Sequence, residues 1–264
     1  ICLLRHDGSG KNAFKNPLSF RYLDDNFIES DAVKIGKTFM DYLKKTKDPR
    51  IHVYCSLKDG NTEFDKQFGL PNGYDSHTIA DAPSGSFVGL ENTSNFNINT
   101  ILRLDAPTIF LMPSETKLLL AEAVLRNWTN GNAEVLYKEA ITSSMKEQEI
   151  AYGTQGKITD EEIETYLAQN LFSTANNTEK LQIIGEQYWV ATFINGYESY
   201  ANWRRTGYPK LIPTNYSGSM SPGVIPTRLP YPTDEYSINR ANVDTANQQQ
   251  GADKVTTHIW WDID

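Results

Sequence analysis

The chain has 264 residues, a formal net charge of -8 and a mean hydropathy of -0.50. This length and composition are typical of a globular protein with its own hydrophobic core, and they exclude a small disulfide-stabilised scaffold. The acidic balance disfavours binding to nucleic acid or to anionic lipid headgroups. The sequence has no run of 18 apolar residues, so no segment is expected to span a bilayer.

A first helix is predicted to begin at Ser30 or Asp31, either of which is a suitable N-terminal cap, and to end near Lys47. Apolar side chains recur between these ends at spacings of three and four residues. Pro49 is expected to end this helix, because the residue before a proline disfavours helical dihedral angles. Apolar and polar residues then alternate over residues 51–55, which predicts a short half-buried strand.

A long irregular segment follows at residues 57–99. Helical and strand periodicity are lost there, and Gly, Asn, Asp, Ser and Pro are frequent. Loops of this length are usually functional or disordered. Five phenylalanine and tyrosine residues are interleaved through the segment, whereas disordered linkers are poor in aromatic residues. We therefore predict an ordered loop with a function.

The clearest helical pattern covers residues 113–129 and ends at an Asn-Gly pair, and a second helix is predicted over residues 133–149. Two antiparallel helices joined by a tight glycine turn, with alanines at the crossing, are typical of a tetratricopeptide-like hairpin. A stable solenoid needs about three such repeats. The partners of this hairpin therefore lie either in a preceding part of the protein or among the other helices of this chain.

Capping residues and apolar spacing predict three further helices, at about residues 160–170, 177–195 and 239–249. Between the last two of these helices, six prolines interrupt residues 208–233. Such a segment cannot form regular structure and is expected to run over the surface as a pinned loop.

Several segments near the end of the chain resemble the closing segments of the SusD/RagB family in both order and spacing. They are the Tyr-Trp pair at residues 188–189, ANWRRTGYP at 201–209, IPTRLPYPTDEYSIN at 225–239 and WWD at 260–262. The helical hairpin and the Asp-Pro-Arg turn at residues 48–50 also lie where that family has a late repeat and the turn into its variable loops. The resemblance thus covers most of the chain.

This resemblance implies a mainly α fold with a tetratricopeptide-like helical hairpin, further helices, long ordered loops and few short strands. It implies one SusD-like C-terminal domain over residues 1–264, with a variable loop region at about residues 57–100. Members of the family are longer, so we expect their first helical repeats and lipid anchor to lie outside this sequence.

The resemblance also implies a role and a location. Members of the family capture glycans or other nutrients at the Bacteroidetes cell surface for polysaccharide utilisation, beside a TonB-dependent transporter. The expected partners are therefore a glycan or other nutrient and that transporter. The expected location is the exposed surface of the outer membrane, contacted only through a lipid anchor outside this chain.

Carbohydrate binding needs aromatic faces for sugar rings, with amides and carboxylates for the hydroxyl groups. The loop at residues 57–99 offers this mixture beside an Asn-Gly turn that should push Tyr74 outward. The candidate carbohydrate-binding residues are Asn72, Tyr74, Asp75, His77 and Phe87. Alternatively, the rings anchor the loop to the helices, which suits Phe87 better than Tyr74.

Catalytic templates are absent from the sequence, which contains no HExxH, GxSxG or CxxC motif. The four histidines are scattered, and the acidic pair Glu161-Glu162 is explained by a helix N-terminus. We therefore expect no catalysis, no metal and no cofactor. Two alternatives stay open: a tetratricopeptide-type protein-interaction scaffold, and a glycoside hydrolase, which needs only two carboxylates placed by the fold.

Two tryptophan motifs are interpreted as structural. Trp203 is expected in the core, with Arg204 and Arg205 satisfying carbonyl groups of the proline-rich loop. Trp260 and Trp261 are expected to dock the end of the chain rather than to form a platform for sugars.

Overall fold

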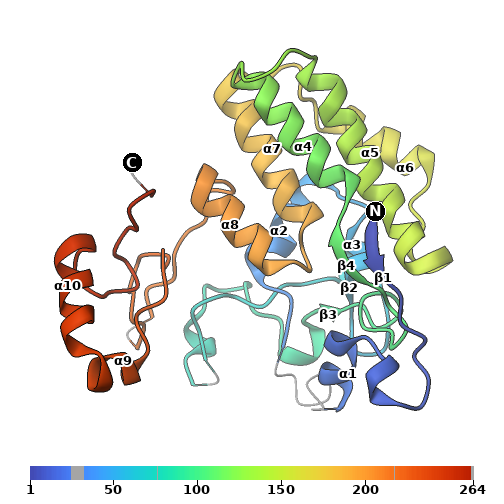
Figure 1. The fold of residues 1–264 in the computed structure, drawn as a ribbon. Helices are drawn as coiled ribbons and strands as arrows, with labels where there is room; N and C mark the ends of the chain where they lie inside the picture. The colour runs from blue at the N-terminus through green and yellow to red at the C-terminus, as the bar shows by residue number, and fades with distance from the viewer. Residues whose placement is uncertain (25–32, 76, 217, 263–264) are drawn as a thin grey trace.

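A computed structural model describes residues 1–24, 33–75, 77–216 and 218–262, and it confirms the predicted mainly helical fold (Figure 1). The α-helices in the described residues are α1 (Pro17–Asp24), α2 (Lys37–Thr46), α3 (Ile51–Tyr54), α4 (Pro113–Leu125), α5 (Ala133–Tyr152), α6 (Asp160–Gln169), α7 (Asn177–Ala191), α8 (Gly196–Thr206), α9 (Thr233–Ile238) and α10 (Arg240–Gln250). The strands are β1 (Cys2–Leu4), β2 (Cys55–Ser56), β3 (Asn95–Phe96) and β4 (Thr108–Leu111). β1 pairs with β4 and β2 with β3, both antiparallel.

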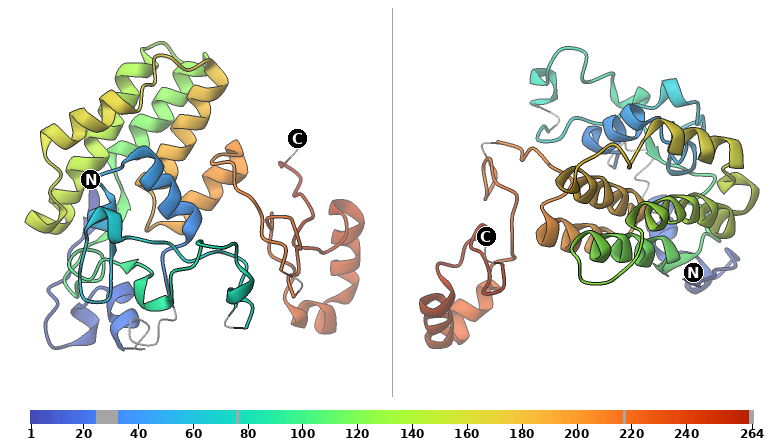
Figure 2. Two further views of the ribbon diagram at one scale, coloured as in Figure 1. Left: turned by 180° about the vertical axis from the view of Figure 1, so that it is seen from behind. Right: turned by 90° about the horizontal axis from the view of Figure 1, so that it is seen from above.

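Helices α4 and α5 form the predicted hairpin, and α7 lies along α4 (Figure 2). Ala121 and Ala140 are completely buried, and such small side chains let helices approach closely. α5 begins where the side chain of Asn132 accepts hydrogen bonds from two backbone N–H groups of the first turn. α4 ends earlier than predicted because Asn127 adopts a left-handed conformation, with φ of 59°.

Helices α6 and α7 begin where their capping residues predict. Thr159 Oγ1 accepts a hydrogen bond from the backbone N–H of Glu162, and the Glu162 carboxylate accepts one from the backbone N–H of Thr159. Asn176 and Glu179 form the same reciprocal pair at the start of α7. These starts depend on residues three positions apart, so the sequence alone is sufficient to find them.

Helix α8 was not predicted. The Asn195-Gly196 pair was interpreted as the end of one helix, but the Asn195 side chain also accepts a hydrogen bond from the backbone N–H of Glu198 and caps a new one. The preceding helix ends at Ala191, earlier than predicted. The same pair therefore separates two helices, α7 and α8, that pack against each other.

The predicted helix near residues 30–47 begins only at Lys37 in the described part of the chain. The expected caps, Ser30 and Asp31, lie outside the described residues. The segment before α2 is extended because Ile35 donates a backbone hydrogen bond to Ser94 and accepts one from Leu70. The long loop therefore forms hydrogen bonds with backbone groups that would be bonded within the helix if the helix began earlier.

The strand predicted at residues 51–55 is wrong over its first four residues, which form helix α3. The carboxylate of Asp48 accepts a hydrogen bond from the backbone N–H of Arg50, and this interaction starts a helical turn. Ile51, Val53 and Tyr54 are all buried, so the alternation of apolar and polar residues did not mark an exposed face. Extended structure begins only at Cys55, in β2.

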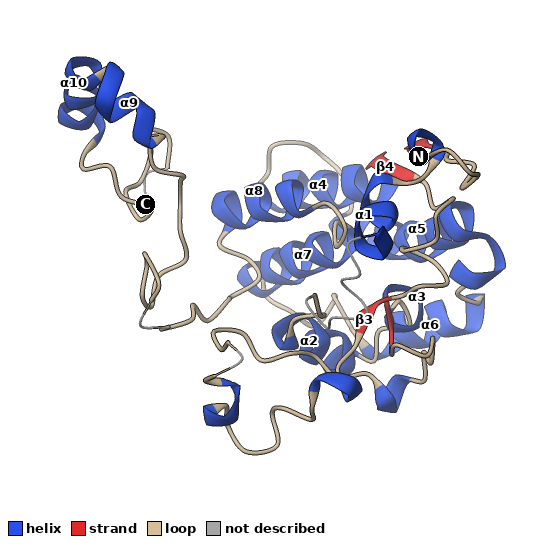
Figure 3. Ribbon diagram, turned by 90° about the horizontal axis from the view of Figure 1, so that it is seen from below, coloured by secondary structure: helices blue, strands red, loops and turns tan. Residues whose placement is uncertain are grey.

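The two irregular segments agree with the predictions for them. Before β3, the described part of the long loop contains short 3₁₀ turns and one isolated β-bridge at Leu70. The described part of residues 207–232 contains no helix or strand. These residues lead to α9 and α10, which lie apart from the main helical body (Figure 3). α10 was predicted, whereas α9 was not; it follows Pro232 and has Asp234 and Glu235 in its first turn, a common start signal.

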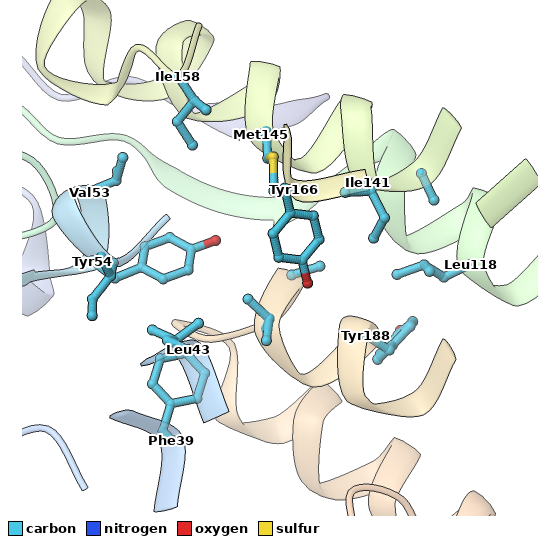
Figure 4. Packing of buried hydrophobic residues seen from close by; sticks show 14 of the residues in the cluster. Phe39, Leu43, Val53, Tyr54, Leu118, Ile141, Met145, Ile158, Tyr166 and Tyr188 are labelled. Carbon is cyan, nitrogen blue, oxygen red and sulfur yellow. The ribbon is translucent and has the colours of Figure 1, made fainter. Parts of the chain in front are cut away.

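The core joins the helical hairpin to α2, α3 and α7 (Figure 4). Aromatic rings pack along one side of it: the ring of Phe39 stacks on that of Phe193 at 4.3 Å between centroids and meets Trp189 edge to face. Tyr54 also stacks on Phe193. Such pairs add to the stabilisation from buried area, and here they connect α2 and α3 to the end of α7.

A fully buried ion pair lies in the turn between α2 and α3. Arg50 and Asp48 are both 0 % exposed, and two guanidinium nitrogens donate to the two carboxylate oxygens at 2.9 and 2.6 Å. Burial disfavours the charge on Arg50, but the adjacent carboxylate raises its pKa above the ordinary value. Arg50 therefore stays charged inside the protein.

The remaining donors of Arg50 reach other helices. Its guanidinium donates to Ser144 Oγ of α5 at 2.9 Å and to Gln187 Oε1 of α7 at 2.7 Å. The side-chain amide of Gln187 then donates to the hydroxyl oxygens of Tyr42 in α2 and Tyr166 in α6. We call these five residues, together with Asp48, the Arg50 network. It joins four helices through side chains that are buried, apart from the half-buried Tyr42.

Replacing Arg50 with alanine should destabilise the fold strongly, because Asp48 would remain buried without a partner. We expect a loss of about 3–5 kcal/mol in the free energy of unfolding, measured by urea titration with circular dichroism. Arg103→Ala is a matched control, since Arg103 and Asp105 form a similar pair, two residues apart, that is partly exposed. The control should lose less than about 1 kcal/mol. Equal losses in the two variants would contradict this account.

Candidate functional site

The turn at residues 71–75 is held against the start of α2. Lys37 donates a backbone hydrogen bond to Leu70, and Leu70 donates one to Ile35, both at 2.7 Å. A Cβ atom at Gly69 would collide with the backbone of Lys37, so glycine permits this close approach. The predicted Asn72-Gly73 turn follows, with φ of 87° at its glycine.

Asp75 fixes this turn to a distant part of the chain. One carboxylate oxygen accepts hydrogen bonds from the backbone N–H groups of His77 and Thr78 and from the Thr78 hydroxyl. The other accepts one from the hydroxyl of Tyr216 at 2.8 Å, across 141 residues of sequence. The hydrogen bond from Tyr216, followed by those from the turn, holds the pKa of Asp75 well below its usual range. Asp75 is thus an ionised structural clamp.

The clamp brings the proline-rich segment beside the long loop. Between them lies an open groove of about 440 Å³, which we call the Tyr74 groove. Its walls come from the start of α2, from the loop at residues 71–74 with Pro83 and Ser86, and from residues 212–215. A second hollow of about 470 Å³ shares Thr38, Asn72 and residues 212–214 with it and continues toward Trp189.

The structure places the five predicted site residues differently. Asn72 and Tyr74 line the Tyr74 groove, and Tyr74 is half-buried. Asp75 stabilises one wall through Tyr216. His77 is exposed and contributes its backbone to the Asp75 turn, and Phe87 is half-buried next to the groove residue Ser86, but neither lines the groove. A role of these residues in binding stays a prediction.

Half of the groove was missed by sequence reasoning. Residues 212–215 and the α2 side chains Lys37 and Asp41 line it, although they lie far from the candidate loop in sequence. The two α2 side chains form an ion pair at 2.7 Å. The only sequence signal for the other wall is the density of prolines, which predicts an exposed segment but not its neighbour.

The tryptophan motifs are structural in part. Trp261 lies 4.6 Å from the Arg204 guanidinium and so docks the chain end on α8, as predicted, whereas Trp260 is 83 % exposed. Trp203 is half-buried against Tyr200 rather than in the core, so that prediction is wrong.

The prediction for Arg205 is wrong as well. Its guanidinium donates to both carboxylate oxygens of Glu122 in α4 at 2.7 Å, and not to the proline-rich loop. A bidentate pair of this kind is favoured where the acid is buried, and Glu122 is only 4 % exposed. The two hydrogen bonds and the charge of Arg205, together with Arg126, lower the pKa of Glu122 despite its burial.

Neither a metal cluster nor a membrane helix is found within the described ranges. No group of three or more His, Cys, Asp or Glu side chains is arranged to hold an ion there. The described helices are also too short or too polar to cross a bilayer.

The chain belongs to the SusD-like family. Its residues 7–232 match the family described as starch-binding and associating with the outer membrane. The match covers most of the chain and agrees with the resemblance seen in its closing motifs. A comparison with curated proteins found no match.

Solved structures have the same fold over all or nearly all of the chain. A chitin-binding protein is 29 % identical, with a TM-score of 0.78, and the match covers 100 % of this chain and 55 % of that one. A SusD homologue from Bacteroides fragilis is 23 % identical with a TM-score of 0.73, covering 99 % and 57 %. A chitin-binding SusD homologue from Flavobacterium johnsoniae is 23 % identical with a TM-score of 0.72, covering 95 % and 53 %. This chain spans a little over half the length of each.

Removing the Tyr216 hydroxyl should release the clamp. The pKa of Asp75 is lower in the folded protein than its ordinary value of 3.8. Ionised Asp75 therefore stabilises the loop at pH values above 3.8, and this stabilisation is lost as the pH falls toward the lower folded-state pKa. Tyr216→Phe should therefore raise the pKa of Asp75, followed by NMR titration of the carboxyl carbon.

Tyr197→Phe serves as the control, since Tyr197 is 92 % exposed on α8. This variant should leave the titration of Asp75 unchanged. If Tyr216→Phe also leaves it unchanged, the two loops are not held together by this hydrogen bond.

Proposed function

We propose that this chain binds an oligosaccharide, or another neutral nutrient, reversibly in the Tyr74 groove without breaking any bond. The observation that carries the proposal is the position of Tyr74 and Asn72 in an open groove whose opposite wall supplies Thr214 and Asn215. An aromatic ring can pack against the C–H face of a sugar, while amides and hydroxyls both donate to and accept from sugar hydroxyls. The 29 % identical chitin-binding protein supports the same class of ligand.

The acids near the groove support binding rather than catalysis. Asp41 is ion-paired with Lys37, and Asp75 accepts four hydrogen bonds that hold it ionised. A glycosidase needs one carboxylic acid with a raised pKa beside a second carboxylate. The pKa of Asp75 is lowered rather than raised, and Asp41 is paired with a cation rather than with a second carboxylate, so these two acids do not form such a pair.

In the whole protein we propose that the groove faces the cell exterior at the outer membrane, with a lipid anchor outside this chain. The bound saccharide would then be delivered to a TonB-dependent transporter. The family description, which includes association with the outer membrane, supports this location. An open groove also suits delivery, since a shallow site releases its ligand faster than an enclosed one.

One observation favours a second candidate function, a tetratricopeptide-type scaffold for another protein. Leu119 and Leu120 of α4 are each 43 % exposed on the helical hairpin, and neighbouring apolar side chains of this kind often mark protein interfaces. This alternative gives the Tyr74 groove no role, so a saccharide-binding experiment separates the two.

Tyr74→Ala should weaken saccharide binding by about 10-fold, equivalent to about 1.4 kcal/mol, because the ring face is lost. The measurement is isothermal titration with chito- and malto-oligosaccharides, followed by chromatography of the recovered sugar. Tyr197→Ala, outside the groove, should bind as the unmodified chain does.

Three outcomes would contradict the proposal. An unchanged dissociation constant in Tyr74→Ala would remove the ring from the site. Recovery of shortened sugars would indicate a hydrolase, and absence of binding to every sugar would favour the scaffold.

A further inference from the structure

A second cleft, of about 590 Å³, lies between α6 and the turn that follows α2. We call it the Phe64 cleft. Its floor is formed by Pro49, Ile51 and Tyr166, and Phe64 comes from the start of the long loop. It shares no lining residue with the Tyr74 groove. The lining is mostly apolar, and its volume is within the range of small-molecule sites.

The cleft is built on rigid elements. Tyr166 is 2 % exposed, and its hydroxyl accepts a hydrogen bond from Gln187 in the Arg50 network at 2.7 Å. The end of α6 is held to the end of α2 because Asn170 Nδ2 donates to the carbonyl of Thr46 at 3.0 Å. The start of α6 is fixed by the Thr159 and Glu162 capping pair. The cleft therefore needs little rearrangement to accept a ligand.

Polar groups at the rim define the chemistry of a suitable ligand. Thr165 and Gln169 of α6 contribute a hydroxyl and an amide, Lys47 contributes an ammonium group and His52 an imidazole, and two adjacent residues, Glu161 and Glu162, contribute carboxylates. Because both signs of charge are present, the rim favours neither a strong anion nor a strong cation. An acyl chain would fill the apolar floor but leave the rim groups without partners. A neutral ring with several hydroxyl groups satisfies both parts of the cleft.

We propose that the Phe64 cleft is a second saccharide subsite, which takes one or two sugar units of the same chain that occupies the Tyr74 groove. This inference rests on the proposed function and extends it from one site to two. Two sites on one rigid chain would hold a polymer more tightly than either site alone, since the second contact becomes intramolecular. Short sugars would gain no such advantage and would fill the sites independently.

The test fills the cleft without disturbing the fold. Thr165 and Ala168 are both exposed on α6, but only Thr165 lines the cleft. Thr165→Trp should lower the stoichiometry for a short chito-oligosaccharide from two to one in isothermal titration, with the affinity at the Tyr74 groove unchanged. Retention by the long polysaccharide in affinity electrophoresis should fall by at least about 10-fold. Ala168→Trp, the matched control, should behave as the unmodified chain does.

The outcomes separate the subsite from the proposed function. If Tyr74→Ala weakens binding while Thr165→Trp matches its control, the second subsite is refuted and the groove stands. If Thr165→Trp removes binding and Tyr74→Ala does not, the cleft is supported and the groove is refuted. If the unmodified chain binds no saccharide, both proposals are refuted.

Discussion

The buried charge of Arg50 is the constraint on which the rest of this structure depends. A guanidinium without solvent is stable only if every donor has a partner, and here the partners come from the α2–α3 turn, α5 and α7. Gln187 extends the requirement to Tyr42 and Tyr166. The hydrogen-bonding groups of the network are therefore all satisfied in only one arrangement of the four helices. Apolar packing alone would tolerate small shifts of one helix against another. Directional bonds make the helical packing specific as well as stable.

Both proposed sites are attached to the elements that this network orients. The Phe64 cleft uses Tyr166 itself as part of its floor. The Tyr74 groove begins on α2, whose side chain Tyr42 is a member of the network, and its far wall is held by the hydrogen bond between Tyr216 and Asp75. Loops with little regular structure can thus present a defined surface, because their ends are fixed by a rigid frame. This arrangement suits the saccharide binding proposed for the two sites.

Local signals explain which parts of the fold were predictable. The caps of α5, α6 and α7 involve residues within one turn of each other, so the helices were found where they start. The strand predicted at residues 51–55 failed because the Asp48 side chain organises a helical turn there. Only Asn72 and Tyr74 of the five predicted site residues line the groove. The wall at residues 212–215 was not predicted, because the contact between Asp75 and Tyr216 that holds it there depends on the whole fold. No pattern in one sequence reveals such a pairing.

The most direct test of the account is amide hydrogen exchange with and without a bound saccharide. The account predicts slower exchange at residues 71–78 and 212–216, with unchanged exchange in α4, α5 and α7 and the saccharide recovered intact. Such a result would mean that a fixed helical frame presents its loops to a ligand that it does not alter. Protection spread over α4 and α5, or consumption of the saccharide, would contradict the account.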